Sequence, residues 1–321
     1  MVESDFTTGV QETLVVIEER LMQAAVADSP FVTEAAQHII RAGGKRFRPV
    51  LVCLGSAFGG QADREDVIRA ALVVELTHVA SLYHDDVMDE ADLRRGAPSA
   101  NRRWTNSIAI MVGDYLFAKA SLTVAELGVD FVTLQARTFA RLVQGQIAET
   151  RGPQPGDDPL RHYLQVVADK TGSLIAASAV FGGMVADASP EVLRALAAFG
   201  EEIGVVFQLS DDLIDITSDH TGKTPGTDLR EGVPTLPTLM LRASQDPADA
   251  PLKELISGDL SDDAVLAEAL RQLRSHPVIS QARAEVQRRA DLAREHLAIL
   301  PEGEAKDALL QICSELVNRA S

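Results

Sequence analysis

The spacing of the prolines limits the fold of this chain more than any other feature of its sequence. The chain has 321 residues, and its 14 prolines separate long proline-free runs, among them residues 50–97, 99–152 and 160–189. Proline breaks the interior of a helix, whereas a proline-free run permits one. Each run is far longer than a strand of about 5–6 residues, and each is rich in Ala, Leu, Glu, Gln and Arg, which favour helix. The runs therefore predict long helices.

The hydrophobic pattern inside the runs supports the same prediction. Leu72, Leu76, Val79 and Tyr83 recur at helical spacing, whereas alternation of β-branched residues with period two is scarce. Asp63, with a second aspartate three residues on, predicts a helix start. We predict an all-α protein with about ten or more helices.

The chain shows no sign of division into domains. It contains no linker-like or low-complexity segment and no repeat of about 20–50 residues, so we predict a single domain over residues 1–321. Two stretches, residues 108–125 and 174–185, are apolar most of the way round a helix. Helices of that kind lie inside a bundle or at a subunit contact, and interior packing is the interpretation that we favour.

The charge balance limits the kinds of partner. With 30 Lys+Arg and 47 Asp+Glu, the formal net charge is −17; nucleic acid and anionic membranes are repelled, and any polyanion must be bound by a local basic cluster. Cys53 and Cys313 have no Cys or His close by in the sequence, which favours a reducing cytoplasm. The first residues lack a signal-peptide pattern, and the longest nearly uncharged stretch, residues 171–186, is shorter than the about 20 apolar residues of a spanning helix. We expect a cytoplasmic protein without a membrane anchor.

Two aspartate motifs with the spacing DDxxD stand out, at residues 85–89 and 211–215. On a helix the first and last aspartates of each motif share a face, one turn apart. Two carboxylates in this arrangement repel each other unless a cation lies between them, and hard oxygen ligands suit Mg²⁺, which is readily shared with substrate phosphates. Each motif also interrupts an apolar helical stretch, where carboxylates have to be balanced. A solvated acidic helix turn is the alternative for either motif alone.

Basic residues near the motifs supply that balance. Glycines at 43–44 precede three cations in segment 45–48, and such glycines let backbone N–H groups and guanidinium groups close around phosphate oxygens. Further cations follow at Arg94, Arg95, Lys170 and Lys223. Surface ion pairs are the alternative, and we favour that interpretation for Arg102 and Arg103. The pattern predicts that two diphosphates are bound, one through metal and one by direct contact with cations.

The ordered motifs resemble those of the trans-isoprenyl diphosphate synthases of the long-chain type, also called polyprenyl synthetases. The match runs through GGKRFRP, HVASLYHDDVMDEADLRRG, DKTG, FQLSDDLID and GKTPGTDLREG, over roughly residues 40–235. The resemblance implies the isoprenoid synthase fold, a helical bundle around a central apolar cavity. It implies an enzyme that condenses isopentenyl diphosphate with an allylic diphosphate, farnesyl or geranylgeranyl, and releases pyrophosphate. It also implies two to three Mg²⁺ ions and a homodimer.

The resemblance assigns roles to particular residues. The implied catalytic residues are the aspartates of both motifs, Asp85, Asp86, Asp89, Asp211, Asp212 and Asp215. The implied metal ligands are the outer ones, Asp85, Asp89, Asp211 and Asp215. The implied site for isopentenyl diphosphate consists of Lys45, Arg48, His78 and Arg95. The implied contacts to the allylic diphosphate are Arg94, Lys170 and Lys223, and the allylic cation would develop beside Thr171 and Gln208. A core histidine is the alternative for His78, although it lies on nearly the same helix face as Asp85.

One position departs from the family pattern. Many members have Lys where this chain has Val233, so a contact to the allylic diphosphate would be missing or replaced by Arg230. The implied reaction is ionisation followed by condensation: cations stabilise the departing pyrophosphate, the double bond of isopentenyl diphosphate attacks the allylic cation, and a proton is lost. No nucleophilic side chain is needed.

The length of the product is predicted from two small residues. Ser81 lies one turn before Asp85 on the same face, and Ala80 is its neighbour. Bulky aromatics at these two positions cap the tunnel in family members with short products. The small residues here predict a long pocket and a product beyond C20, about C30–C50. Tyr83 and Phe117 are alternative candidates for a floor.

Five alternatives stay open. A class I terpene cyclase shares the first aspartate motif, but its second motif normally mixes Asn, Ser or Thr, and Glu. The catalytic subunit of a heteromeric prenyl synthase and a short-chain geranylgeranyl diphosphate synthase would carry the same motifs as this chain. A non-catalytic subunit often lacks the aspartates that this chain retains in full, and an acidic helical binding protein is the least favoured alternative.

Overall fold

The structure is a computed structural model, and it describes residues 5–217 and 225–319. The chain divides into two compact units, each assembled from separate stretches. Unit 1 comprises Met1–Ala140, Leu174–Ala197 and Ile299–Asp307, and unit 2 comprises Arg141–Ser173, Ala198–Ala298 and Ala308–Ser321. The single domain over residues 1–321 stays a prediction.

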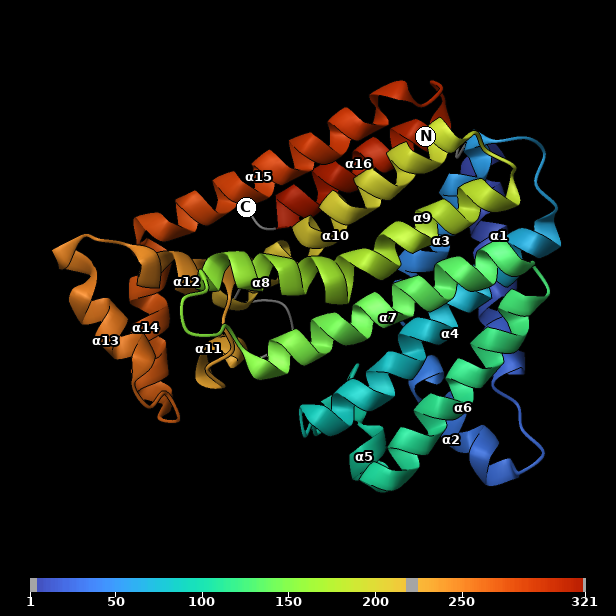
Figure 1. Ribbon diagram of the computed structural model, residues 1–321. Helices are drawn as coiled ribbons and strands as arrows, with labels where there is room; N and C mark the ends of the chain where they lie inside the picture. Colours follow the sequence, from blue (N-terminus) through green and yellow to red (C-terminus); the bar gives the residue numbers. More distant parts are fainter. Residues whose placement is uncertain (1–4, 218–224, 320–321) are drawn as a thin grey trace. The chain divides into compact units, whose positions relative to one another are not determined.

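Almost every element is a helix, so the predicted all-α class is confirmed (Figure 1). The elements in chain order are α1 (Asp5–Ala24), α2 (Pro30–Arg41), α3 (Phe47–Gly55), η1 (Ser56–Phe58), α4 (Arg64–Met88), β1 (Leu93–Arg94), β2 (Ala97–Pro98), α5 (Ala100–Arg103), α6 (Asn106–Ala125), α7 (Val129–Arg151), α8 (Pro159–Val167), η2 (Ala168–Gly172), α9 (Ser173–Val185), α10 (Pro190–Thr217), α11 (Thr227–Arg230), α12 (Leu236–Ala243), η3 (Pro247–Asp249), α13 (Ala250–Ser257), α14 (Asp263–Ser275), α15 (Pro277–His296), η4 (Leu297–Ile299) and α16 (Glu304–Arg319).

Helix α4 forms the centre of unit 1. It packs along α6 and also contacts α1 and α3, and residues 70–77 are buried on every side of the helix. The side chains that recur at helical spacing, Leu72, Leu76, Val79 and Tyr83, are all among the buried residues. The predicted start is also confirmed, because the carboxylate of Asp63 accepts the N–H of Glu65 at 2.8 Å. A buried helix that ends in acidic residues therefore leads to the first aspartate motif.

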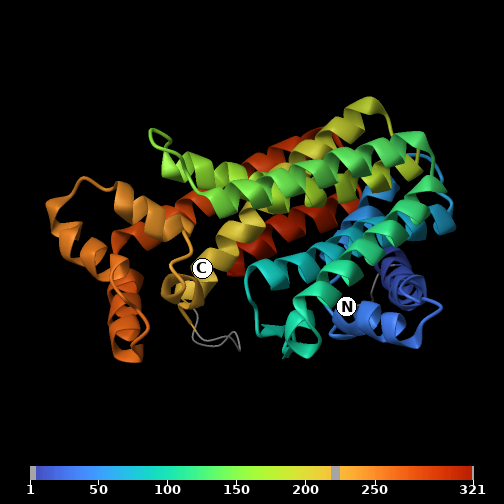
Figure 2. The same cartoon turned by 60° about the horizontal axis from the view of Figure 1, so that its bottom comes forward.

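Unit 2 is built around the second half of α10. Helices α15 and α16 lie side by side in both views (Figure 1 and Figure 2), and a hydrogen bond of 3.1 Å joins Arg294 to Ser314 between them. Ser210 of α10 donates a hydrogen bond to the carbonyl of Leu316 on α16 at 3.1 Å. These contacts fix the helix that carries the second aspartate motif.

The two apolar stretches differ in burial. Residues 174–179 of α9 are buried as expected for interior packing. In α6, by contrast, Ile110, Met111 and Leu122 are exposed, so interior packing does not account for this helix. Among the described residues, α6 is the one helix with the length and apolar composition of a membrane span, yet it carries Asp114 and Lys119 and packs along α4. The subunit contact stays a prediction for this stretch.

Candidate active site

The first aspartate motif occupies the last turn of α4. The helix ends at Met88, and Asp89 is its C-cap, with its N–H donated to the carbonyl of Asp85 at 2.8 Å. Asp85 is half-buried and Asp89 is exposed. The outer carboxylates of the motif are therefore both accessible at the end of a buried helix, one turn apart as the spacing predicts.

The central aspartate of the motif has a different environment. Asp86 is completely buried, and its Oδ1 accepts from Arg94 at 2.6 Å (Nε) and 2.5 Å (Nη2). Burial raises the pKa of the Asp86 carboxyl, and the neighbouring Arg94 opposes that rise. Its Oδ2 is buried without a hydrogen-bond partner. Asp86 thus holds Arg94 in place and is not available as a metal ligand in this arrangement.

A small antiparallel hairpin presents the two arginines that follow the motif. Strand β1 pairs with β2, with Arg94 opposite Ala97, and the two residues between the strands both have positive φ, 53° at Arg95 and 78° at Gly96. This is the conformation of a tight two-residue turn, which favours glycine at the second position. The hairpin directs Arg94 toward Asp86 and Arg95 toward the glycine-rich segment.

The glycine-rich segment and the hairpin form one basic cluster. The Arg95 guanidinium donates to the carbonyl of Gly43, and a Cβ at Gly44 would lie 2.9 Å from Arg95 Cζ, so a side chain at Gly44 would displace this guanidinium from its present position. Arg48 is half-buried, and its Nε is buried without a hydrogen-bond partner. Burial and the nearby Arg95 lower the pKa of Arg48 to about 10. Lys45 is exposed at the edge of the segment.

His78 lies within the field of this cluster. Burial lowers its pKa well below the usual range, and the charges of Arg48, Arg95, Arg94 and Arg46 lower it further. The imidazole is therefore neutral at physiological pH, surrounded by cations that an anion would stabilise. Burial is the largest cause of this shift, so a core histidine and a histidine of the anion site both stay predictions for His78.

Arg46 shows why not every cation of the segment serves a ligand. It is buried, and its guanidinium contacts Glu18 at 2.5 Å and Glu75 at 2.9 Å. Both carboxylates come from other helices, α1 and α4. Arg46 is thus a structural residue that fixes the segment between α1 and α4, while Arg48 keeps an unsatisfied donor.

The second aspartate motif lies at the end of α10. Asp211 forms an ion pair of 3.0 Å with Arg319 of α16 and remains 42% exposed. The Asp215 carboxylate accepts the backbone N–H groups of Thr227 and Asp228, each at 3.2 Å. The outer carboxylates thus have partners from α16 and α11, yet both stay at least partly accessible.

Asp212, the central aspartate of the second motif, is buried among protein partners as Asp86 is in the first motif. It is 2% exposed and accepts hydrogen bonds from the Tyr163 hydroxyl, from Gln208 Nε2 at 3.2 Å and from the N–H of Leu236 at 2.9 Å. Burial raises its pKa to about 7, and these hydrogen bonds oppose the rise. Asp212 therefore joins α8, α10 and α12, and the amide of Gln208 is oriented by it.

Lys170 and Thr171 lie in a π-helical turn, η2, between α8 and α9. Turns of this kind are rare and often occur at functional sites. Lys170 Nζ contacts the carboxylate of Glu149 on α7 at 2.5 Å, and Thr171 is half-buried. The turn thus holds an ammonium group that already lies against a carboxylate.

The arrangement fits a divalent metal that is shared with a substrate. Among the described residues, no group of three or more His, Cys, Asp or Glu side chains forms a metal cage. Each motif instead offers accessible outer carboxylates, which suits Mg²⁺ because this ion keeps several waters and is usually bound together with substrate phosphates. Asp85 and Asp89 in unit 1, and Asp211 and Asp215 in unit 2, are the residues that would hold such ions.

The predicted site residues therefore fall into two groups. Unit 1 brings together Lys45, Arg48, His78, Ala80, Ser81, Asp85, Asp86, Asp89, Arg94 and Arg95, and unit 2 brings together Lys170, Thr171, Gln208, Asp211, Asp212 and Asp215. Lys223 lies outside the described residues. Val233 is exposed, and Arg230, its suggested replacement, forms an ion pair with Asp263. Sequence reasoning missed Tyr163 and Glu149, for which no local motif gave a signal.

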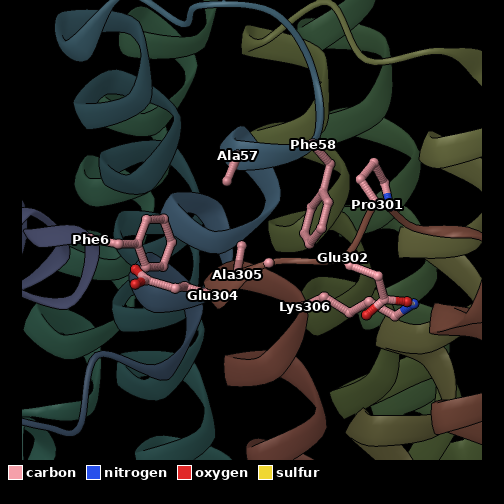
Figure 3. A pocket seen from close by; sticks show the side chains of 9 residues that line it. Phe6, Ala57, Phe58, Pro301, Glu302, Glu304, Ala305 and Lys306 are labelled. Atoms are coloured by element: carbon pink, nitrogen blue, oxygen red, sulfur yellow. Dashed lines mark hydrogen bonds and ion pairs between the residues drawn. The ribbon is translucent and has the colours of Figure 1, made fainter. Parts of the chain in front are cut away.

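Two cavities are lined by residues outside these groups. One of about 250 Å³ in unit 1 is lined by Phe6, Phe58 and segment 301–306, and Figure 3 shows the Phe6 and Phe58 rings beside it. The other, about 290 Å³ in unit 2, borders Ala168 at the start of the π-helical turn. Neither is lined by a predicted site residue.

Comparisons with known proteins define the family. The family model "Polyprenyl synthetase" matches residues 29–273. Nonaprenyl diphosphate synthase of Mycobacterium tuberculosis is 45% identical over 304 residues, 94% of this chain and 91% of the relative. Heptaprenyl diphosphate synthase component 2 of Geobacillus stearothermophilus is 37% identical, over 94% of this chain and 93% of the relative. The crystal structure of geranylgeranyl pyrophosphate synthase from Corynebacterium glutamicum, complexed with calcium and isoprenyl diphosphate, has a TM-score of 0.90 at 43% identity and covers 99% of this chain and 98% of its own.

A helical fold with two DDxxD motifs and a separate arginine-rich cluster defines a prenyltransferase of the isoprenoid synthase fold. This chain belongs to the polyprenyl synthetase family. The predicted family and fold are thereby confirmed, and the family's members are chain-elongating prenyltransferases.

Proposed function

We propose that this protein condenses isopentenyl diphosphate with an allylic prenyl diphosphate and releases pyrophosphate, giving an all-trans polyprenyl diphosphate. One observation carries the proposal: both motifs bury the central aspartate against protein partners and leave the outer carboxylates accessible. This division of roles suits two acidic sites for cations bound to a diphosphate. The names of the relatives, which make prenyl diphosphates of several lengths, support the same reaction.

Mg²⁺ is the metal that we propose for these carboxylates. The bound ions would neutralise charge that develops on the departing pyrophosphate. Arg94 and Lys170 would add direct contacts to that charge; Arg94 is fixed by Asp86, and Lys170 by Glu149. Since these donors are oriented before substrate binds, they need little reorganisation when the carbon–oxygen bond breaks. The calcium in the crystal structure of the C. glutamicum relative is consistent with a divalent-metal site.

The basic cluster of unit 1 is the site that we propose for isopentenyl diphosphate. Burial lowers the pKa values of Arg48 and Arg95; Arg95 lowers that of Arg48 further, and Arg46 and Arg94 lower that of Arg95. A diphosphate would relieve this repulsion and satisfy the buried Nε of Arg48. The nucleophilic double bond would then be held by its own diphosphate, separately from the allylic substrate.

Replacing Arg48 with methionine is expected to raise the KM for isopentenyl diphosphate by about 10- to 100-fold, because a hydrogen-bonded charge contact contributes about 1.5–3 kcal/mol. The KM for the allylic diphosphate should change by less than about threefold. Steady-state kinetics with each substrate varied in turn measures both values. Arg102→Met is the matched control, since Arg102 is exposed and pairs with Asp92 at 2.5 Å on the surface. Equal increases in both KM values would contradict the assignment.

The reaction itself is tested with purified protein, Mg²⁺, isopentenyl diphosphate and farnesyl or geranylgeranyl diphosphate. We expect pyrophosphate release together with an elongated prenyl chain beyond C20. A cyclic hydrocarbon would point to a terpene cyclase, and inactivity of the chain alone would favour a subunit of a heteromer, as the name of the G. stearothermophilus relative suggests. Product of C20 alone would favour the short-chain alternative. A cytoplasmic location stays part of the proposal.

We propose a homodimer formed through α6 and the start of α7. Leu122 and Val129 are 67% and 80% exposed, and Ile110, Met111 and Val132 are exposed nearby in the sequence. So many large apolar side chains on neighbouring helices mark an interaction surface. The predicted subunit contact for the apolar stretch 108–125 is consistent with this proposal.

Replacing both Leu122 and Val129 with glutamate is expected to weaken dimerisation by about 100-fold or more, because charged groups would be buried at the contact. Light scattering over a range of protein concentrations measures the change. Ile299→Glu introduces the same charge at an apolar side chain that is 51% exposed elsewhere in unit 1, and it should leave assembly unchanged. A double variant that dimerises like the unmodified protein would place the contact on another surface.

A further inference from the structure

The π-helical turn that carries Lys170 is held through the residue before it. The Asp169 carboxylate accepts hydrogen bonds from Arg141 Nε at 2.5 Å and from Gln165 Nε2 at 2.8 Å. The Asp169 carbonyl accepts from Ser173 Oγ at 2.6 Å. Asp169 therefore faces protein partners, and the reaction assigns no part to it.

Arg141 links this turn to α10. Its guanidinium also contacts both carboxylate oxygens of Glu201, Oε1 through Nη1 and Oε2 through Nη2 at 2.8 Å. Its Nη2 lies 3.4 Å from the carbonyl of Ala168, the first residue of the turn. The hydrogen bonds to Glu201 raise the pKa of Arg141 above its ordinary value, so the guanidinium is charged at physiological pH. One planar guanidinium thus joins the turn to α10 from its place on α7.

Side-chain packing alone does not hold the turn. Ala168, Gln165 and Glu201 line the cavity of about 290 Å³ in unit 2, so one side of the turn borders open space and not a packed core. On the α7 side, a Cβ at Gly145 would lie 2.6 Å from Lys170 N. The glycine lets the backbone of α7 approach the turn. Arg141 lies four residues earlier on the same helix face, and its side chain forms the hydrogen bonds that hold the turn against α7.

We propose that Arg141 is a positioning residue that sets the place of Lys170 and Thr171 at the allylic diphosphate. It acts through Asp169 and Glu201 and does not itself contact substrate. The inference rests on the proposed function, because it requires that Lys170 bind the allylic diphosphate. Loss of Arg141 removes the links from Asp169 to α7 and from the turn to Glu201, and it leaves Gln165, Ser173 and the ion pair of Lys170 with Glu149. The backbone that carries Lys170 and Thr171 then loses part of its support, while the basic cluster of unit 1 is unaffected.

The test compares Arg141→Met, Arg141→Lys and Arg137→Met in steady-state kinetics with each substrate varied. Arg137 is exposed on the same helix, so its removal controls for loss of a cation from α7. We expect Arg141→Met to raise the KM for the allylic diphosphate about 10- to 100-fold, with the KM for isopentenyl diphosphate within about twofold. The KM of Arg141→Lys for the allylic diphosphate should lie between those of the unmodified enzyme and Arg141→Met, because one ammonium group cannot replace a guanidinium that contacts two carboxylates.

Two further variants separate the possible failures. Combining Asp169→Asn with Arg141→Met should raise the KM for the allylic diphosphate no further than Arg141→Met alone does, since the two residues act as one unit. Lys170→Met tests the proposed function: an unchanged allylic KM there would remove the premise. If Lys170→Met raises that KM but Arg141→Met matches Arg137→Met, or raises both KM values equally, the positioning role is overturned. Thermal melting of each variant identifies a loss of folding, and an Arg141→Lys enzyme with unmodified kinetics would likewise overturn the role.

Discussion

Replacing Asp85 with asparagine is expected to lower kcat by about 1,000-fold, the scale seen when one preorganised electrostatic group is removed from an active site. Asp85 is the accessible outer carboxylate at the end of α4, and the amide of asparagine is a much weaker ligand for Mg²⁺. The fold should survive, because Asp85 is half-buried and lies in the last helical turn. Kinetics at saturating substrate over a Mg²⁺ titration would show both the lower kcat and a higher metal requirement.

Asp86→Asn is the matched comparison, because it makes the same chemical change one residue away. Asp86 is buried and paired with Arg94, so its loss leaves a partly buried cation without its partner, which costs about 3–5 kcal/mol. We expect a clear drop in melting temperature and a Mg²⁺ requirement close to that of the unmodified enzyme. If Asp86→Asn shifted the metal requirement while Asp85→Asn did not, the assignment of outer ligands and central anchors would be wrong.

The sequence predicted the helices and the outer aspartates because both depend on local spacing. Proline-free runs and the period of Leu72 and Leu76 determine a buried helix without reference to distant residues. In the same way, residues four apart in DDxxD share a helix face wherever the helix lies. The closing of the glycine-rich segment around phosphate oxygens stays a prediction, and in the structure Gly44 lies close to the Arg95 guanidinium.

The partners of the central aspartates could not be predicted from local pattern. Tyr163 reaches Asp212 from 49 residues away, and Arg94 reaches Asp86 only through a tight turn at Arg95 and Gly96. Arg46 and Arg48 differ by two positions, yet only Arg46 meets Glu18 and Glu75. Which of two similar cations is structural depends on carboxylates contributed by other helices, and a single sequence does not encode that pairing locally. The interior placement favoured for residues 108–125 did not hold for a related reason, since a helix that is apolar all round does not reveal which face a partner covers.

Replacing Ser81 with phenylalanine is expected to shorten the product by at least two isoprene units. Ser81 is small and 8% exposed, and its hydroxyl donates a hydrogen bond to the carbonyl of His78 at 2.8 Å. An aromatic ring at this position, one turn before Asp85, would fill space that the growing chain is proposed to occupy. Ala80 is a poorer test: it is fully buried, and a Cβ at Gly113 of α6 would lie 3.2 Å from its carbonyl oxygen. Phenylalanine there would overpack the α4–α6 contact at a cost of about 1–3 kcal/mol.

The two residues predicted as a floor, Tyr83 and Phe117, provide the opposite change. Tyr83 donates its hydroxyl to the carbonyl of Ala35 at 2.5 Å, so it is fastened to α2 and is the weaker candidate. The Phe117 ring lies 4.2 Å from that of Phe139, centroid to centroid, and joins α6 to α7. Phe117→Ala is therefore expected to lengthen the product by one or more isoprene units, where Ser81→Phe shortens it and Ser81→Ala leaves it unchanged. Chromatography of the dephosphorylated products with a farnesyl primer measures all three. The same chain-length distribution from Ser81→Phe and Phe117→Ala would mean that the prenyl tail does not run between α4 and α6.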